Sequence, residues 1–195
     1  MMQEMNPQKI NPRTQRARDA LMDATHVLVA KRPVAEISLT EIAEMAGVSR
    51  PTVYNLFRDT PTLVAATAVE NMVGIFKEIH EALPQGNDEE YLHRVMQMFI
   101  DRVYEERTFS RNAMFGPSSV EITAAVVDLL SDTMRDGFIG TRLRATSDDI
   151  EDRLTVISAG VIWLLTQWLD SDFKGVNAPN KTAKRFSDTI LALSR

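Results

Sequence analysis

The sequence predicts an all-α protein of about nine helices, and three observations support this. Apolar residues recur at spacings of three and four along most of the 195 residues, as they do on one face of an α-helix. No segment shows the strict alternation of a half-buried β-strand. Eight Gly and eight Pro are too few for a loop-rich β-sandwich. We expect a tail at residues 1–12, a small helical domain at 13–59 and a larger one at 60–195.

Composition excludes several classes of protein. The chain is 44% hydrophobic and 25% charged, which is typical of a globular protein rather than a disordered one. It contains no Cys, which excludes a disulfide framework, a thiolate zinc site and a cysteine nucleophile. The polar N-terminus lacks the apolar segment of a secretory signal. The longest apolar stretch, Ala159 to Leu169, is shorter than the about 20 residues that span a membrane. We therefore expect a soluble, cytoplasmic protein with no membrane partner, cofactor or metal.

Charge is distributed unevenly along the chain. The formal net charge is −5, yet residues 1–58 contain eight basic and six acidic side chains. The remaining residues contain 14 basic and 21 acidic side chains. A basic N-terminal part on an acidic body indicates two different tasks, although so small an excess arises by chance about as readily.

The first expected helix begins near Arg13 and ends before Pro33, because proline disfavours a helical conformation in the residue before it. A short second helix covers residues 38–46. Ser38 and Glu41 have the spacing of a capping box at its start, and Gly47 ends it because glycine tolerates a left-handed backbone. A third helix covers residues 49–57, with a Ser N-cap and a Pro in its first turn.

Residues 38–57 have the pattern of a helix-turn-helix. Two helices that cross steeply need a small residue at their closest approach, and Ala43 satisfies this. They also need a turn residue without a Cβ penalty, and Gly47 satisfies that. Apolar residues point into the corner, namely Ile42, Ala46, Val48, Val53 and Leu56. An ordinary corner between two helices is the alternative interpretation.

The residues that this pattern leaves outside on the second helix suit DNA. Arg50 can pair with guanine and Asn55 with adenine, and the methyl group of Thr52 can contact thymine. Tyr and Ser hydroxyls can donate to phosphates. The N-terminal residues of a recognition helix face the base edges in the major groove. The DNA-contacting residues that we expect are Ser38, Thr40, Ser49, Arg50, Pro51, Thr52, Tyr54, Asn55 and Arg58.

Three short segments, Ile42-Ala43, Ala46 to Ser49 and Thr52 to Phe57, resemble the N-terminal domain of the TetR (tetracycline repressor) family. The resemblance covers about residues 13–65. It implies a homodimer that binds a palindromic operator in double-stranded DNA and releases it when a small molecule enters the body. It also implies that Tyr54 contacts a phosphate. Where the family usually has a phosphate-contacting lysine, this chain has Thr60. Arg58, or the start of the next helix, would then take over that contact.

The larger domain contains the remaining helices. They are expected at about residues 60–83, 88–106, 118–143, 148–171 and 180–193, with a helical turn in the break at 107–117. Asp59, Asp88, Ser118 or Ser119, Ser147 or Asp148, and Asn180 are the expected N-caps.

Methionine and aromatic side chains are candidates for lining a pocket in this domain. Such side chains form adaptable apolar sites, although each of them is more often ordinary core. The resemblance places an effector cavity among the fourth to eighth helices, for a small apolar or amphipathic molecule. The candidate lining residues are Met96, Phe99, Tyr104, Phe109, Met114, Phe115, Phe138 and Trp163. The polar residues that could orient a ligand there are His80, His93, Tyr104, Arg107 and Arg111.

The helix at 148–171 is apolar over most of its circumference, so we expect it to be covered on two sides, one of them by a second subunit. The last helix has an apolar stripe as well. Two such helices from each subunit would form a four-helix interface. The expected interface residues are Ile157, Val161, Leu165, Trp168, Phe186, Ile190 and Leu193; Val156, Ile162, Trp163 and Leu169 lie on other faces of the first helix.

The favoured functional hypothesis is a ligand-responsive transcriptional regulator, most simply a repressor. The alternative is a DNA-organising or protein-interaction factor that uses the same N-terminal domain without an effector. An enzyme is disfavoured, because His26, His80 and His93 have no metal-ligand spacing. The acidic run at 148–152 stands at the start of a helix, where it serves the helix dipole.

Overall fold

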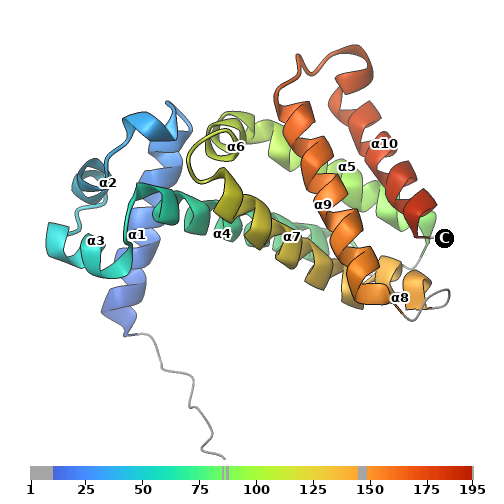
Figure 1. Cartoon of the computed structure of the whole chain (residues 1–195), viewed down its shortest axis with the longest axis horizontal. Coiled ribbons are helices and arrows are strands. Elements are labelled where there is room, and N and C mark those ends of the chain that lie inside the picture. The colour runs from blue at the N-terminus through green and yellow to red at the C-terminus, as the bar shows by residue number, and fades with distance from the viewer. Residues whose placement is uncertain (1–10, 85, 87, 145–148, 195) are drawn as a thin grey trace, which may run out of the picture.

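The protein is all-α, as the sequence predicts. A computed structural model describes residues 11–84, 86, 88–144 and 149–194. These residues form ten α-helices and two short 3₁₀ segments, without a β-strand. Helices α1 to α3 form a head at one end of the molecule, and α4 runs from it into a bundle that we call the body (Figure 1). No single helix of this described part has the length and apolarity to cross a membrane; one sharply bent pair, α6 with α7, passes by length and composition alone.

The helix bounds follow the sequence pattern closely in the head. The head contains α1 (Pro12–Val29), η1 (Val34–Glu36), α2 (Leu39–Met45) and α3 (Arg50–Leu56). The body contains α4 (Thr60–Ala82), α5 (Glu89–Glu105), α6 (Arg107–Met114), α7 (Ser119–Asp136), α8 (Phe138–Arg144), α9 (Ile150–Leu169), η2 (Gly175–Asn177) and α10 (Pro179–Leu193).

The body departs from the prediction in two places. The helix expected at 118–143 is broken into α7 and α8 at Gly137, whose backbone is extended. The two helices then approach so closely that a Cβ on Gly140 would lie 1.9 Å from the carbonyl oxygen of Arg135. The turn expected within 107–117 is a complete helix, α6. The described residues therefore contain ten helices rather than about nine.

The predicted helix caps are only partly formed. The Ser38 hydroxyl accepts from the Glu41 N–H at 3.1 Å, but the Glu41 carboxylate is bound by Arg32. Asp88 caps α5 through the Tyr91 N–H at 2.7 Å. Helix α10 begins at Pro179, so Asn180 lies inside its first turn. The expected caps Ser147 and Asp148 lie outside the described residues, and Ser118 and Ser49 precede their helices without a side-chain cap bond.

Asp59 caps α4 at the connection between head and body. Its carboxylate accepts from the Thr62 hydroxyl at 2.7 Å, from the Thr62 N–H at 2.8 Å and from Arg58 Nε at 2.8 Å. These hydrogen bonds, with those from Thr62 first, lower the pKa of Asp59 to about 2. The cap is therefore a carboxylate across the neutral and mildly acidic range.

We expect Asp59→Ala to lower the free energy of unfolding by about 1 kcal/mol at neutral pH. The folded-state pKa lies below the unfolded value of about 3.9, so this stabilisation is complete above that value and is lost as pH falls towards 2. Urea unfolding of the wild-type and Asp59→Ala proteins from pH 7 downwards should show that the difference between their free energies of unfolding shrinks. In the matched Asp59→Asn variant the cap does not titrate. A wild-type to alanine difference that stays constant down to pH 2 would contradict this assignment.

Head and body share a continuous hydrophobic core. Leu21 of α1 and Ile42 and Val53 of the α2–α3 corner are completely buried, and Leu63 of α4 continues this packing into the body. The centre of the body is formed by large side chains such as Phe99, Trp168 and Phe186. Because close-packed cores transmit strain, a shift of the body helices would strain the packing of the head.

Candidate nucleic-acid interface and ligand cavity

The corner between α2 and α3 has the geometry that the sequence predicts. Gly47 adopts a left-handed backbone, with φ of 64°. The Val48 N–H donates to the Ala43 carbonyl at 2.9 Å and closes the turn. Ala43 is completely buried, which lets the two helices approach closely. This corner holds α3 against the rest of the head and turns its outer face to solvent.

The outer face of α3 carries Arg50, Pro51, Tyr54 and Asn55, all exposed and spaced one and four residues apart. Tyr54 is 56% exposed although its ring is largely apolar, whereas Val53 on the opposite face is completely buried. Nothing in the described part of the chain covers these four side chains. The polar groups of Tyr54 and Asn55 are therefore accessible to the edges of bases and the phosphates of a duplex.

The other predicted DNA-contacting residues surround this face. Ser38, Ser49 and Arg58 are exposed, while Thr40 and Thr52 are half-buried. The hydroxyls of Ser49 and Thr52 are hydrogen-bonded to each other at 2.7 Å. The structure thus leaves seven of the nine predicted residues accessible: Ser38, Ser49, Arg50, Pro51, Tyr54, Asn55 and Arg58.

Two of the basic side chains are already paired. Arg50 lies 3.0 Å from Glu44, and Arg58 lies 2.8 Å from Asp59. Exposed pairs of this kind contribute at most about 1 kcal/mol, so a phosphate can displace the carboxylate. The N-terminus of α4 is occupied by the Asp59 carboxylate, which makes it a poorer anion site than the sequence indicates.

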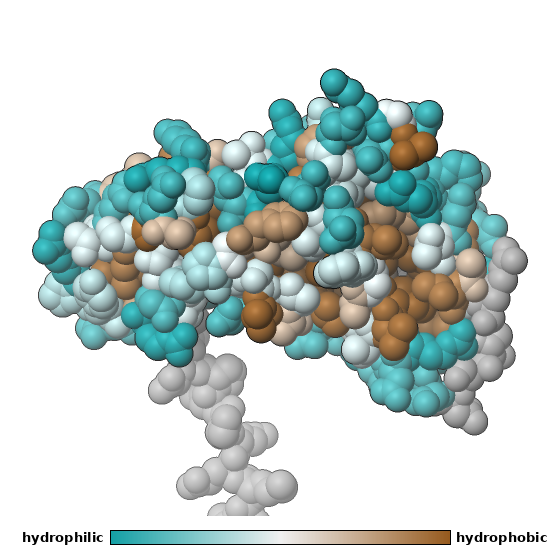
Figure 2. Space-filling model, turned by 45° about the horizontal axis from the view of Figure 1, so that its top comes forward, coloured by the Kyte–Doolittle hydropathy of each residue, from teal (hydrophilic) through white to brown (hydrophobic). Residues whose placement is uncertain are grey.

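The head also presents basic residues on α1. Arg13 and Arg16 are exposed in its first turns. The Arg18 guanidinium lies 5.4 Å from the centre of the Phe57 ring, which links α1 to the end of α3. Hydrophilic residues predominate at the head end of the molecule, and the larger hydrophobic patches lie over the body (Figure 2).

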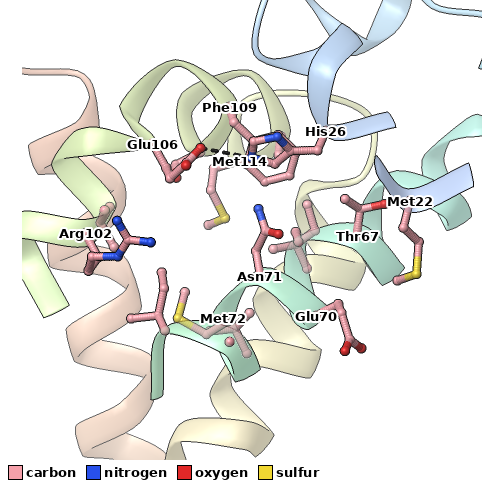
Figure 3. Close-up of a pocket in the computed structure, with 18 of the residues that line it drawn as sticks. Met22, His26, Thr67, Glu70, Asn71, Met72, Arg102, Glu106, Phe109 and Met114 are labelled. Atoms are coloured by element: carbon pink, nitrogen blue, oxygen red, sulfur yellow. Dashed lines mark hydrogen bonds and ion pairs between the residues drawn. The ribbon is translucent and has the colours of Figure 1, made fainter. Parts of the chain in front are cut away.

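A cavity of about 580 Å³ lies at the junction of head and body. We call it the junction cavity. Its walls come from α1, α4, α5, α6, α7 and α9, and its labelled polar and sulfur-containing side chains are shown in Figure 3. Its apolar lining is formed by Met22, Val27, Met72, Ile75, Val103, Phe109, Ala113, Met114, Ile122, Val126, Ile162, Leu165 and Leu169.

Polar groups of the head and the body meet at this cavity. His26 Nε2 on α1 lies 2.9 Å from a carboxylate oxygen of Glu106, and the His26 ring stacks on Phe109 at 4.6 Å. The amide of Asn71 points from α4 towards the centre of the cavity (Figure 3). The Arg102 guanidinium lies 2.9 Å from Glu78 and also binds Glu105, and these contacts, with the Glu105 hydrogen bond first, raise its pKa.

Helix α6 is tied to the head at two points beside the cavity. The Asn112 side chain donates to the carbonyl of Val29 in α1 at 2.7 Å. The second point is the His26 contact with Glu106 and Phe109. A molecule in the cavity would therefore touch both the head and the helix that holds it. The sequence gives no signal that four residues of this cavity belong together, because no motif within a single helix links them. These residues are His26, Asn71, Arg102 and Glu106.

The predicted pocket residues are divided among several environments. Phe109 and Met114 line the junction cavity. Met96 and Phe138 line a second cavity of about 470 Å³ between α4, α5, α7, α8 and α10. The other four line neither of these cavities. Phe99 is buried and stacks on Phe76, Tyr104 packs edge-on against Phe173, and Phe115 and Trp163 are 50% and 65% exposed.

The polar residues proposed for ligand orientation lie mostly elsewhere. His80 lines the second cavity. His93 is hydrogen-bonded to Ser187, and Arg111 lies 2.8 Å from Asp170. Arg107 stacks over the ring of Tyr104. The junction cavity is therefore polarised by a different set of side chains from those that the sequence suggested.

Most of the side chains that the sequence predicts for the subunit interface are buried within the single chain. Ile157, Val161, Leu165, Trp168, Phe186 and Ile190 are buried inside the single chain, and only Leu193, which is 49% exposed, reaches the surface. The reason is that α9 packs its apolar stripe on α7, and α10 packs its own on α5. The exposed apolar residues of α9 are Val156 and Trp163, which are 67% and 65% exposed, with Ala159 and Gly160 between them.

Comparisons with known proteins agree with the head geometry. The sequence profile of the bacterial regulatory proteins of the tetR family matches residues 21–67. An uncharacterized HTH-type transcriptional regulator of Mycobacterium tuberculosis is 34% identical over 70 residues, and one of Mycobacterium bovis matches equally. The match covers 36% of this chain and 35% of each relative, so the chain aligns with about a third of the relatives' length.

Solved structures share the fold over nearly the whole chain. A TetR transcriptional regulator from Rhodococcus sp. RHA1 has a TM-score of 0.63 at 16% identity and covers 91% of this chain and 96% of its own. FadR of Thermus thermophilus, a TetR family repressor solved with lauroyl-CoA, has a TM-score of 0.63 at 19% identity, over 91% and 92% of the two chains. Residues 21–67 thus match the profile of the tetR family of bacterial regulatory proteins, and the described chain shares its fold with these solved regulators.

Proposed function

We propose that this protein is a ligand-responsive repressor that binds a palindromic operator as a homodimer. Residues 13–59 bind DNA, and residues 60–195 hold the effector and form the dimer. The observation that carries the proposal is the uncovered outer face of α3, with Arg50, Tyr54 and Asn55 exposed on a rigid Gly47 corner. A family profile that spans this corner supports the same reading.

The exposed side chains of α3 have complementary roles at a duplex. Arg50 stands at the first residue of α3, where a recognition helix faces the base edges, and it can pair with guanine. Asn55 can pair with adenine, and the Tyr54 hydroxyl can donate to a phosphate. One helix of seven residues reads few bases, so two copies would read half-sites about 34–36 Å apart or a multiple of that distance.

The outer face of α9, which carries the exposed residues Val156, Ala159, Gly160 and Trp163, supports the homodimer. Gly160 stands in the middle of this helix, where glycine costs about 1 kcal/mol relative to alanine. A Cβ on Gly160 would meet no atom within 4 Å in its own chain, so packing within the chain does not require it. A helix of a second copy that crosses closely at Gly160, flanked by Val156 and Trp163, would require it and would bury both exposed side chains.

The junction cavity provides a route from ligand to DNA. Its walls include α1 of the head and α6, which is bonded to α1 through Asn112 and Glu106. A ligand that fits the cavity better in one orientation of the head shifts the population towards that orientation. If the half-site spacing is then wrong for the operator, operator affinity falls and the gene is released.

Arg50→Ala is expected to weaken operator binding by about 1–3 kcal/mol, which is about 5- to 150-fold, and to relax sequence preference at one position. Tyr54→Ala should weaken binding to all sequences alike, because phosphate contacts carry no sequence information. Fluorescence anisotropy with labelled duplexes at one fixed salt concentration measures both effects. Arg185→Ala is the matched control, since it removes the charge of another exposed arginine from α10, far from the head (Figure 1). Equal losses in all three variants would contradict the assignment of α3.

A further inference from the structure

We infer that the junction cavity selects amphipathic ligands whose polar end is a cation, such as an organic ammonium group. This inference rests on the proposed function and specifies the class of effector. The cavity is lined by four carboxylates, those of Asp23, Glu70, Glu78 and Glu106, and by one guanidinium, that of Arg102. No lysine is among the lining residues.

The basic side chains of the cavity are already paired with carboxylates of the protein. The Arg102 guanidinium is held by Glu78 at 2.9 Å and by Glu105. The His26 ring is held by Glu106 at 2.9 Å. A ligand carboxylate or phosphate would have to break one of these pairs and would face the displaced carboxylate at close range. The lining therefore offers an anionic head group no uncompensated positive charge.

Two of the four carboxylates remain available to bind a ligand cation. Asp23 on α1 and Glu70 on α4 are exposed at the edge of the cavity, and within the described residues no basic side chain pairs with either. Apolar walls beside them concentrate their field, which raises the local concentration of cations. The Asn71 amide, which points into the same space, can accept a hydrogen bond from an ammonium N–H (Figure 3).

The apolar walls accept the remainder of such a ligand. Methionine contributes three side chains, Met22, Met72 and Met114, which adapt to irregular shapes. Phe109 and Ile75 add a ring and a branched side chain. The second cavity is apolar too, but its lining contains one carboxylate, Asp136, beside His80. Negative charge is thus concentrated at the junction cavity and not at the second cavity. Such a lining would repel the phosphates of an acyl-CoA.

Three probes with the same chain and different head groups test this inference: decylammonium, decanol and decanoate. Each is added to the full chain below its micelle concentration at one ionic strength, and binding is followed by calorimetry and by the melting temperature. We expect the cation to bind about tenfold more tightly than decanol, and decanoate to bind most weakly. The preference for the cation should shrink as salt is raised, because its source is partly exposed charge.

A pair of double variants identifies the source of the preference. Asp23→Asn with Glu70→Gln should remove most of the difference between the cation and decanol while decanol binding persists. Glu81→Gln with Asp128→Asn removes the same charge from exposed positions of α4 and α7 outside the cavity, and should leave the difference intact.

The possible outcomes separate the inference from the proposed function. If decanol or decanoate binds as well as the cation, the charge assignment is overturned, and a ligand-responsive regulator remains. If the two double variants lose the preference equally, the carboxylates of the cavity are not its source, and the assignment also fails. If none of the probes binds, the inference fails together with the effector cavity, while operator binding through α3 stands as a separate result.

Discussion

Gly160→Leu is expected to convert the protein from a dimer to a monomer and to weaken operator binding by roughly 10²- to 10⁴-fold, the gain that linking two binding modules provides. The leucine side chain would occupy the space through which a second α9 approaches. Because the position is open within one chain and leucine is the better helix former, the single chain should fold at least as stably. Analytical ultracentrifugation and operator anisotropy at matched concentrations measure the two effects.

The control for this variant is the same substitution at Gly74, on α4. A Cβ there also meets no atom within 4 Å, but the residue lines the junction cavity rather than the outer face of α9. Gly74→Leu should remain dimeric. Should Gly160→Leu sediment as a dimer with unchanged operator affinity, the outer face of α9 is not the subunit interface.

Gly74→Leu is expected to abolish the response to effector while operator binding is retained. The new side chain fills part of the 580 Å³ cavity from the α4 wall without displacing backbone. Since helix propensity improves by up to about 1 kcal/mol, the ligand-free fold should not suffer. The variant should therefore behave as a permanent repressor.

The measurement compares operator affinity with and without whichever decyl probe binds the unaltered protein. The unaltered protein should lose operator affinity when the probe is added, and Gly74→Leu should not. Gly160→Leu serves in turn as the control for cavity binding, which it should keep. A Gly74→Leu protein whose melting temperature still rises with probe, as far as that of the unaltered protein, would show that the ligand binds elsewhere.

The sequence was sufficient to predict the structure of the head because the signals that define the head are local. The Ser38 cap, the Gly47 turn and the buried Val53 all lie within about 20 residues and concern one corner. Each has a physical reason that can be read without knowing what the rest of the chain packs against. The fold class follows from the same kind of local periodicity.

The sequence was not sufficient to predict which face of α9 stays exposed, because an apolar helix does not reveal which of its faces its own chain covers. Ile157 and Val161 continue a perfect apolar stripe, and the structure uses that stripe for the core. Val156 and Trp163 were visible as apolar residues on other faces, and only the packing of α9 on α7 shows that they remain exposed.

The junction cavity depends on contacts between distant residues. His26 and Glu106 are 80 positions apart, and the Asn112 bond to Val29 joins residues 83 positions apart. No local pattern brings these together, because the cavity exists only where six helices meet. The sequence also did not predict the helix break at Gly137, since a single glycine inside a helical pattern is usually tolerated.

Selection from a random library of duplex DNA by the full-length protein tests most directly whether the outer face of α3 binds a duplex. We predict enrichment of a palindrome whose half-site centres are about 10–10.5 base pairs apart, or a multiple of that spacing. Selected duplexes should bind far more tightly than random ones at the same salt concentration. Failure to enrich any sequence, together with no binding of duplex DNA even at low salt, would contradict the assignment of the head as a DNA-binding domain.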